Sequence, residues 1–482
     1  MEFVSKINAS VNAFVWGIPM LILIMGTGVY FTLRTGWLQF FKFPLVMKKV
    51  FRSAKTEVKR DQGAVSPFQA VTTALAATLG TGNIAGVAGA IALGGPGAVF
   101  WMWVSALFGM ATKYAEVLLA IRFRKRNEKG EWVGGPMYYI TRGLGKNWRW
   151  LAILFACFGA VAAFGIGNMA QMNTISTAVI SLFESFSPDP NMIIESGHTI
   201  KLVAGILVAF ISALVIMGGI KRIGEVTEKC IPLMSVLYLL GAVIIIGVNI
   251  EKLGPVLSDI VDGAFRPEAV TGGAAISMLT SMQRGIGRGV FSNEAGMGSA
   301  PIAHAAANTK SPVEQGFFGI FEVFADTIVI CTVTALVILM GLNDIAYGQN
   351  AGAELTVRAF ATVFTDKGAS AIVAVGVLFF AVATIFSWSL YGTRCCEFLL
   401  GPKSTKPYQL LFLGFTVLGA TMEMGLVWEI ADTLNGLMSL PNLIAILALS
   451  GTVARLTRDY KDTLRLSPKH RRTPNATKRT RI

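Results

Sequence analysis

Long apolar runs alternate with short polar connections along the chain, and this pattern decides the fold class. A helix needs about 20 predominantly apolar residues to cross the hydrocarbon core of a bilayer. Eleven runs approach or exceed that length: residues 11–33, 68–92, 98–121, 149–183, 201–220, 227–249, 271–303, 314–341, 369–398, 407–422 and 425–452. They predict an all-α integral membrane protein with 11 transmembrane helices.

Basic residues lie in every second connection between the apolar runs. They gather in residues 34–60, 122–149, 221–229, 394–406 and 455–481, whereas the other connections are poor in basic residues and carry acidic ones. Connections rich in Lys and Arg stay in the cytoplasm. The alternation therefore predicts a multi-pass protein of the bacterial inner (plasma) membrane, with its N-terminus outside and its C-terminus cytoplasmic. The first apolar run is too long for a cleavable signal peptide and has only Lys6 as a basic flank.

Composition agrees with a membrane protein and excludes other classes. Of the 482 residues, 53% are hydrophobic and 15% charged, whereas soluble domains carry about 25% charged residues. The net charge of +14 follows from the basic loops and tail, so it indicates no nucleic-acid partner. The five cysteines show no metal-ligand spacing, and we interpret them as packing residues. The sequence contains no Ser-His-Asp arrangement, zinc spacing or P-loop, so we expect no enzyme.

Two connections carry signs of secondary structure. Residues 122–148 form a long cytoplasmic connection in which the motif GGPMYY, at residues 134–139, favours a short helix. Residues 353–364 have helical periodicity and predict a helix that caps the external mouth.

Glycine-rich sequence interrupts two of the apolar runs at membrane depth. Residues 78–86 read TLGTGNIAG, and residues 283–301 read QRGIGRGVFSNEAGMGSAP. Small residues four apart, such as Gly285 and Gly289, also allow helices to pack closely. We favour a binding site because the interruptions lie five segments apart, in corresponding places of a five-plus-five arrangement. Unwound helix frees carbonyl oxygens for a cation and N–H groups for a carboxylate.

The fourth segment carries polar side chains that suit an amino acid ligand. Phe164, Asn168 and Gln171 are spaced to share one helix face. An aromatic ring and two amides on one face would supply an apolar wall together with hydrogen-bond donors and acceptors. The alternative is a hydrogen-bonded pair between two helices.

Oxygen-bearing side chains in later segments suit a cation. Thr384 and Ser387 lie on one helix face together with Trp388, although hydroxyls in membrane helices mostly bond their own backbone. Asp326 lies in an apolar run, where a carboxylate costs about 2.5–3.5 kcal/mol. We expect Asp326 to coordinate a cation or to take up a proton; a buried hydrogen bond to another helix is the alternative.

Three more ionisable residues lie near the ends of apolar runs. Lys113 and Glu116 are expected to reach the inner interface or to pair there. His304 follows the seventh run and is expected at the membrane interface.

Three long motifs carry a family resemblance: GTGNIAGV at residues 80–87, GGPGAVFWMW at residues 94–103 and FSNEAGMGSAP at residues 291–301. They resemble the bacterial and archaeal alanine or glycine:cation symporter family, also called the sodium:alanine symporter family. Residues 134–139, 326–331 and 435–442 also match its motifs. The resemblance extends from about residue 10 to residue 452.

The resemblance implies a leucine-transporter-like fold, in which one N-terminal extra helix precedes a core of two inverted five-helix repeats with two broken helices. The expected divisions are an extra helix at residues 1–34, a cytoplasmic basic loop at 35–67, the first repeat at 68–250, an extracellular connection at 251–270, the second repeat at 271–452 and a basic cytoplasmic tail at 453–482.

The resemblance also implies Na⁺-coupled, sometimes H⁺-coupled, uptake of alanine or glycine by alternating access, with glutamine as a possible substrate of some relatives. Carried over by motif, the substrate site comprises Thr78, Gly80, Thr81, Gly82, Asn83, Phe164, Asn168, Gln171, Gly285, Asn293 and Trp388. Candidate Na⁺ ligands are Asn83 with the Thr78 carbonyl, the Ala76 and Leu79 carbonyls with Thr384 or Ser387, and Asp326. Two alternatives stay open: an H⁺-coupled permease that uses Asp326, and a membrane sensor that binds an amino acid without moving it.

Overall fold

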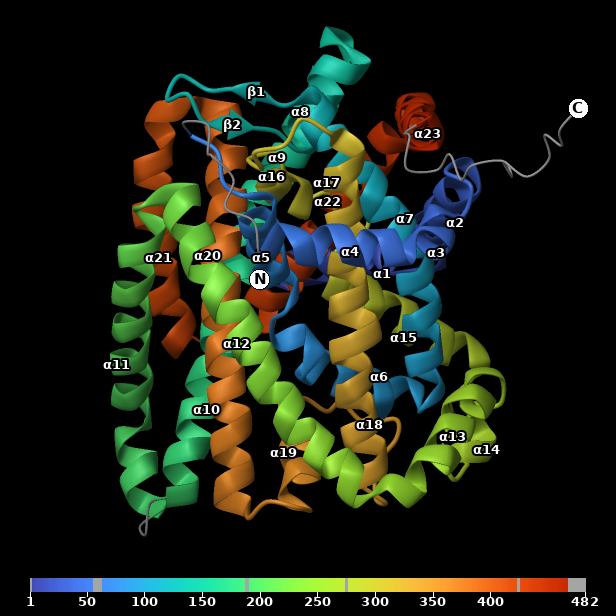
Figure 1. Cartoon of the computed structure of the whole chain (residues 1–482). Helices are drawn as coiled ribbons and strands as arrows, with labels where there is room; N and C mark the ends of the chain where they lie inside the picture. Colours follow the sequence, from blue (N-terminus) through green and yellow to red (C-terminus); the bar gives the residue numbers. More distant parts are fainter. Residues whose placement is uncertain (1, 55–62, 187–189, 274–275, 423–424, 467–482) are drawn as a thin grey trace, which may run out of the picture.

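The computed structural model describes residues 2–54, 63–186, 190–273, 276–422 and 425–466. Helices make up nearly all of its regular structure, and their arrangement is a bundle (Figure 1). The short hairpin β1–β2 and helix α8 lie at one end of the bundle, and α13, α14 and α19 lie at the other (Figure 1).

The N-terminal part of the chain forms four helices: α1 (Glu2–Val15), α2 (Ile18–Arg34), α3 (Leu38–Phe41) and α4 (Phe43–Ala54). Helix α4 runs across the bundle and packs on α17 (Figure 1). Val46 and Val50 of α4 are buried, whereas Lys48 and Arg52 are exposed. The stretch predicted as a basic loop at residues 35–67 therefore holds two helices, because its apolar residues recur at a helical spacing among the charged ones.

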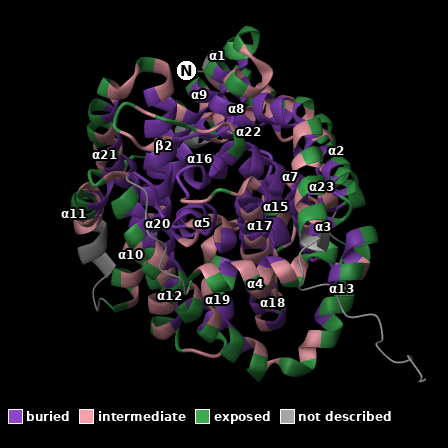
Figure 2. Ribbon diagram, turned by 45° about the horizontal axis from the view of Figure 1, so that its top comes forward, coloured by how far each residue is buried: buried purple, intermediate pink, exposed green. Residues whose placement is uncertain are grey.

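The first half of the remaining chain contains most of the long helices. Its elements are α5 (Pro67–Thr78), the 3₁₀ turn η1 (Thr81–Asn83), α6 (Ala85–Gly94), α7 (Gly97–Phe123), α9 (Arg149–Phe164), the π-helical turn η4 (Gly165–Met169), α10 (Ala170–Phe186), α11 (Pro190–Ile216) and α12 (Gly219–Val248). Ser66 and Gln69 form a capping box that begins α5. Helix α5 lies among buried residues near the centre of the bundle (Figure 2).

The second half begins with η5 (Ile250–Lys252), α13 (Leu253–Phe265) and α14 (Pro267–Val270). It continues with α15 (Met278–Asn293), α16 (Ala300–His304), α17 (Pro312–Val323), the π-helix η6 (Phe324–Cys331), α18 (Thr332–Gly341), α19 (Ala353–Ala361), α20 (Asp366–Leu400), η7 (Pro402–Ser404), α21 (Thr405–Thr421), α22 (Gly425–Ala448) and α23 (Ser450–Leu466). Helix α19 confirms the helix predicted within residues 353–364.

The connection between α7 and α9 is more structured than the sequence indicated. It contains β1 (Lys125–Arg126), β2 (Trp132–Val133), α8 (Pro136–Tyr139), the π-helical η2 (Ile140–Leu144) and η3 (Lys146–Trp148). The predicted short helix is confirmed as α8, whereas the hairpin was not predicted. Strands of two residues are too short to leave a readable alternation of apolar and polar positions.

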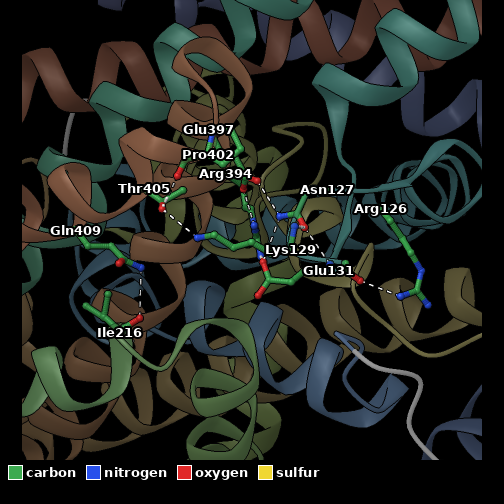
Figure 3. Close-up of polar contacts among 11 residues, drawn as sticks. Arg126, Asn127, Lys129, Glu131, Ile216, Arg394, Glu397, Pro402, Thr405 and Gln409 are labelled. Atoms are coloured by element: carbon green, nitrogen blue, oxygen red, sulfur yellow. Dashed lines mark hydrogen bonds and ion pairs between the residues drawn. The ribbon is translucent and has the colours of Figure 1, made fainter.

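Ion pairs hold this hairpin against the end of α20 (Figure 3). The Arg394 guanidinium lies 2.6 Å from a Glu131 carboxylate oxygen and 2.5 Å from one of Glu397. Asn127 Nδ2 donates to Glu397 Oε1 at 2.8 Å. Partial burial raises the pKa of the Glu131 carboxyl, but the Arg394 charge and the hydrogen bonds from Arg394 and Asn127 together outweigh it and hold this pKa below its usual range.

Length and composition identify the helices that can cross a membrane. Within the described residues eight helices qualify, or nine if the bent pair α5–α6 is one span. The other two predicted spans correspond to α15 with α16 and to α21, in which α15 has 16 residues and α21 has 17. The structure therefore supports an all-α membrane protein, and the full number of 11 spans and the inverted repeat remain predictions.

Exposed apolar side chains on the outer helices agree with a lipid surround. Large hydrophobic residues of α11 and α12 are more than half exposed, among them Val203, Ile206, Phe210, Leu233 and Leu240. A soluble protein rarely exposes an apolar surface of this extent. These faces can instead contact lipid chains.

Candidate functional site

The first predicted break is present between α5 and α6. Helix α5 ends at Thr78, α6 begins at Ala85, and the two are bent by 59°. Gly80 N donates to the Thr78 carbonyl at 3.0 Å and to Asn83 Oδ1 at 2.9 Å, so the break folds back on itself. In the described structure the bonds of this segment use the N–H groups of Leu79, Gly80, Asn83 and Ile84, and they leave those of Thr81 and Gly82 without a backbone acceptor.

Asn83 connects this break to two other segments. Its Nδ2 atom donates to Asp326 Oδ1 at 2.6 Å and to Ser292 Oγ at 3.1 Å. Ser292 Oγ donates to the same Asp326 oxygen at 3.0 Å, and Thr327 Oγ1 donates to Asp326 Oδ2 at 2.7 Å. Asp326 is fully buried, and no ion pair with it is found among the described residues. A buried carboxylate with only neutral donors is suited to a nearby cation or to a proton.

Side chains from α10 and α20 meet the break at Gly80. A Cβ atom on Gly80 would lie 2.8 Å from Thr384 Oγ1 and 3.6 Å from Gln171 Oε1, so glycine allows these two side chains to approach the break closely. Gln171 Oε1 is buried and has no hydrogen-bond partner in the described structure. Its Nε2 atom donates to the Ile166 carbonyl at 3.1 Å. A buried acceptor without a donor costs about 1–3 kcal/mol unless a ligand supplies one.

Hydroxyls of α20 reach carbonyl oxygens of α5. Thr384 Oγ1 lies 2.9 Å from the Ala76 carbonyl oxygen, and Ser387 Oγ lies 2.7 Å from that of Thr73. Four oxygens from two helices are thereby gathered beside the break, a donor set that hard cations prefer. The sequence prediction included Ala76, Thr384 and Ser387 but missed Thr73, because its role depends on a helix more than 300 residues away.

Two other predicted cation ligands are less directly engaged. The Thr78 carbonyl accepts a hydrogen bond from Gly80 N, and the Thr78 hydroxyl donates to the Leu75 carbonyl at 3.3 Å. Leu79 N donates to the Leu75 carbonyl at 2.7 Å, and Leu79 is the residue at which α5 ends. No hydrogen bond to the Leu79 carbonyl is found among the described residues, so this oxygen is available to a ligand.

The second break lies later than predicted. Helix α15 continues through Gly285 to Asn293, and the break follows at residues 294–299. Gly285 packs on α7 instead, since a Cβ there would lie 2.3 Å from the Ala98 carbonyl oxygen. The interruption is thus found within residues 283–301, as predicted, but it follows Asn293 and does not include Gly285, which has the close-packing role named as its alternative.

Asn293 lies at the edge of this second break and is linked to the first through side chains of η6. Its Nδ2 atom donates to Thr327 Oγ1 at 3.0 Å, and its Oδ1 atom accepts from Ala295 N at 3.0 Å. Thr327 in turn bonds Asp326, so a chain of hydrogen bonds runs from Asn293 to Asn83. Ser292, next to Asn293 in a quoted motif, was missed; only this adjacency could have indicated it.

Phe164 and Asn168 face away from the break. The Phe164 ring lies 4.8 Å from the rings of Tyr408 and Phe415 on α21, and Asn168 Nδ2 donates to the Phe412 carbonyl at 2.6 Å. The shared face predicted for Phe164, Asn168 and Gln171 does not form, because the π-helical turn η4 lies between Phe164 and Gln171 and shifts the register. Only Gln171 contacts the Gly80 region.

Trp388 lies one turn beyond Thr384 on α20 and is buried against η4. A Cβ on Gly167 would overlap its side chain at 2.2 Å, and its ring meets Tyr391 edge-on at 5.6 Å. Trp388 thus packs α20 against the turn that carries Asn168. In this structure Trp388 therefore holds together the helices around the site.

A network of buried charges joins α7, α16 and α17. Lys113 Nζ is 3.2 Å from Glu322 Oε1, and His304 Nε2 is 3.2 Å from Glu322 Oε2. Gln315 Nε2 lies 2.9 Å from His304 Nδ1. Lys113, His304 and Glu322 are fully buried. Lys113 therefore pairs, which is one of its two expected roles, whereas His304 is enclosed by protein and does not have the exposed interfacial position expected for it. The sequence left their shared partner Glu322 unidentified.

Comparison with known proteins decides what this site belongs to. The sequence description of the sodium:alanine symporter family matches residues 1–474. The chain belongs to the sodium:alanine symporter family. It is therefore a multi-pass membrane transporter and no enzyme, and its family implies sodium as the coupling ion.

The similarity to individual relatives extends over almost the full length of both chains. The sodium/alanine symporter AgcS of Methanococcus maripaludis is 45% identical over 96% of this chain and 98% of its own. An uncharacterized transporter of Haemophilus influenzae is 44% identical over 96% of this chain and 98% of its own. The probable sodium/glutamine symporter GlnT of Bacillus subtilis is 36% identical over 95% of this chain and 91% of its own. These names support an amino acid as the substrate class of the symporter.

Proposed function

We propose that the protein imports a small neutral amino acid, alanine or glycine, together with Na⁺ by alternating access. The observation that carries this proposal is the unpartnered Gln171 Oε1, which lies beside Gly80 at a break with free backbone N–H groups. One buried acceptor and two N–H donors complement an ammonium and a carboxylate. The close packing of Thr384 and Gln171 around Gly80 favours a substrate with a short side chain.

The proposed substrate position follows from these groups. The carboxylate meets the N–H groups of Thr81 and Gly82, at the start of the helical turn that leads into α6. The ammonium meets Gln171 Oε1. The Asn83 side chain fixes the break by accepting from Gly80 N and donating to Asp326.

Sodium is the proposed second cargo. The Ala76 and Thr73 carbonyls with the Thr384 and Ser387 hydroxyls supply one oxygen set. Asn83 Oδ1 has a second lone pair beyond the Gly80 bond, and Asp326 supplies negative charge nearby, which supports another. Coupling arises if the ion stabilises the conformation that binds the amino acid.

The membrane potential and the Na⁺ gradient provide the driving force. One Na⁺ crossing 100 mV supplies about 2.3 kcal/mol, and a tenfold Na⁺ gradient supplies about 1.4 kcal/mol more. Together they allow accumulation of roughly several hundredfold. The proposed topology places the protein in the inner membrane with 11 spans, two inverted repeats, the N-terminus outside and the C-terminus inside.

Uptake of labelled L-alanine into proteoliposomes tests the proposal. An inward Na⁺ gradient is compared with choline plus a pH gradient, and glycine and glutamine are added as competitors. We expect accumulation only with Na⁺, competed by glycine and lost in Gln171→Ala, while Asn173→Ala on the same helix serves as the matched control. Accumulation driven by protons alone would assign coupling to Asp326. Stronger competition by glutamine than by glycine would change the substrate assignment to glutamine. Binding of alanine without accumulation would favour a sensor.

A further inference from the structure

A polar cavity of about 370 Å³ lies beside the first break but outside the site described above. Its walls come from α1, α15 and α22, and its polar lining includes Asn12, Gln283, Arg284, Arg288 and Asp432. Trp16, Gly287 and Phe291 supply the apolar part. A free amino acid such as alanine is small enough to enter a space of this size.

Opposite charges occupy separate walls of this cavity. Arg284 and Arg288 lie one turn apart on α15, and Asp432 lies on α22. Asn12 Nδ2 donates to Asp432 Oδ2 at 2.9 Å, and the Arg288 guanidinium lies 5.6 Å from the centre of the Phe291 ring. Among the described residues, no ion pair within 4.0 Å joins either arginine to Asp432. Arg284 is exposed and Arg288 and Asp432 are partly buried, so these charges are accessible to a molecule that enters the cavity.

Phe291 forms the wall between the cavity and the break. Its ring lies 3.7 Å from the position that a Cβ on Gly82 would occupy, and 6.2 Å from the Trp16 ring. Ser292, the next residue, bonds Asn83. A molecule in the cavity is therefore separated from the proposed substrate site by one aromatic side chain.

We propose that this cavity is a second binding site for an α-amino acid zwitterion, occupied before the molecule passes Phe291. The carboxylate pairs with Arg288 and Arg284, and the ammonium pairs with Asp432. Because two cationic groups face one carboxylate, the cavity accepts a zwitterion and disfavours an amine that lacks a carboxyl group. The proposal rests on the proposed function, since it takes the same substrate class.

Equilibrium binding of labelled alanine to the purified protein in nanodiscs tests the second site. We expect two molecules per wild-type chain at saturation, and one in Arg288→Gln, in Asp432→Asn and in Gln171→Ala. Arg288→Lys keeps the charge and is expected to restore part of the binding, which separates lost recognition from misfolding. Arg358→Gln serves as the matched control, because Arg358 forms an exposed pair with Asp344 at 2.7 Å, outside the cavity.

Transport kinetics give an independent readout. Arg288→Gln is expected to raise the KM for alanine about tenfold or more, in line with the loss of a charged hydrogen bond, and to leave the Na⁺ dependence unchanged. A stoichiometry of one in the wild-type protein, or an unchanged stoichiometry and KM in Arg288→Gln, would overturn the second site alone. If alanine, glycine and glutamine all fail to bind the wild-type protein, both the second site and the proposed function are wrong.

Discussion

The two helix breaks differ in what stabilises them. A single amide side chain holds the first break: Asn83 bonds Gly80 and the Asp326 carboxylate, and N–H groups and Gln171 Oε1 are left without partners. The second break is held by bonds to its own groups, since the Glu294 carboxylate accepts a hydrogen bond from Ser299 Oγ and the Gly296 carbonyl accepts from Asn442 at 2.8 Å. The first break therefore offers free groups to a ligand, whereas the second is tied into the scaffold.

Backbone conformation follows the same division. Glu294, Gly296 and Gly298 have φ values of 53°, 92° and 81°, in the left-handed region. None of residues 79–84 has a positive φ. A non-glycine residue in this region costs about 1–2 kcal/mol, so the surroundings of Glu294 must offset that cost. The second break is thus a fixed turn, and the first is an opened helix.

The largest expected effect comes from the amides at the two breaks. Asn83→Ala removes one bond to a buried carboxylate, worth about 1.5–3 kcal/mol, together with the bonds to Ser292 and Gly80, worth about 0.5–1.5 kcal/mol each, so Na⁺-driven uptake should fall about 100-fold or more. Asn293→Ala removes bonds to a hydroxyl and an N–H group only, and about a tenfold loss is expected. Uptake rates at saturating Na⁺ measure both. Equal losses in the two variants would contradict the difference drawn between the breaks.

Removing the lysine beside the second break tests the role of charge there. Lys113→Met leaves Glu322 buried without its cation, and about 3–5 kcal/mol of stability should be lost. Lys49→Met is the matched control. Lys49 of α4 pairs with Glu314, which lies on α17 as Glu322 does, but both side chains of this pair are 36% exposed. The expected loss of stability is therefore less than about 1 kcal/mol. Thermal unfolding in detergent compares them. A restored transition in Lys113→Met/Glu322→Gln would confirm that the unpaired charge causes the loss.

Two glycines of α15 test whether this helix packs closely on α7. Gly285→Ala should lower stability by about 1–3 kcal/mol, because its Cβ would lie 2.3 Å from the Ala98 carbonyl oxygen. Gly287→Ala has no atom within 4 Å of its Cβ and should be neutral or stabilising by about 0.4–1 kcal/mol. Thermal unfolding of the two single variants measures the contrast. Similar losses for both would show that α15 does not pack on α7 as described.

The smallest effect concerns the hairpin at the bundle end, where charges are partly solvated. The pKa of Glu131 is lowered in the folded protein, so its stabilising effect is present above its unfolded pKa of about 4.3 and is lost as pH falls through the folded value. Glu131→Gln should lower the free energy of unfolding by less than about 1 kcal/mol at pH 7. It should also reduce the fall in stability that the wild-type protein shows as the pH is lowered below about 4.3, the acid limb of the stability profile. Glu128→Gln, on the same hairpin, is the control and should keep the wild-type acid limb.

The sequence predicted the membrane class, the first break and the helix α19 because each depends on local pattern. It could not distinguish the glycines of residues 285–289 from those of residues 80–82. The difference lies in the partner helix: Gly285 and Gly289 are in contact with Ala98 and Ser105 of α7. A glycine-rich run indicates a close approach or a break, and only the tertiary neighbour decides between them.

Side-chain direction in the fourth segment was mispredicted for a different reason. Helical spacing assumes 3.6 residues per turn, and the π-helical turn Gly165–Met169 departs from it. Gln171 thus reaches Gly80 while Phe164 packs on α21. The long-range pairs Lys113–Glu322 and Asn83–Asp326 were likewise beyond reach, since no local pattern records which helices become neighbours.

Cys331 gives the molecule a chemical reporter at its centre. Its sulfur lies 3.3 Å from Asn83 Nδ2 and 3.4 Å from Ser292 Oγ, and the residue is 2% exposed. A thiol reagent can reach this sulfur only when the segments around the first break separate. The alkylation rate of a native side chain therefore records how often the centre of the protein is accessible to water.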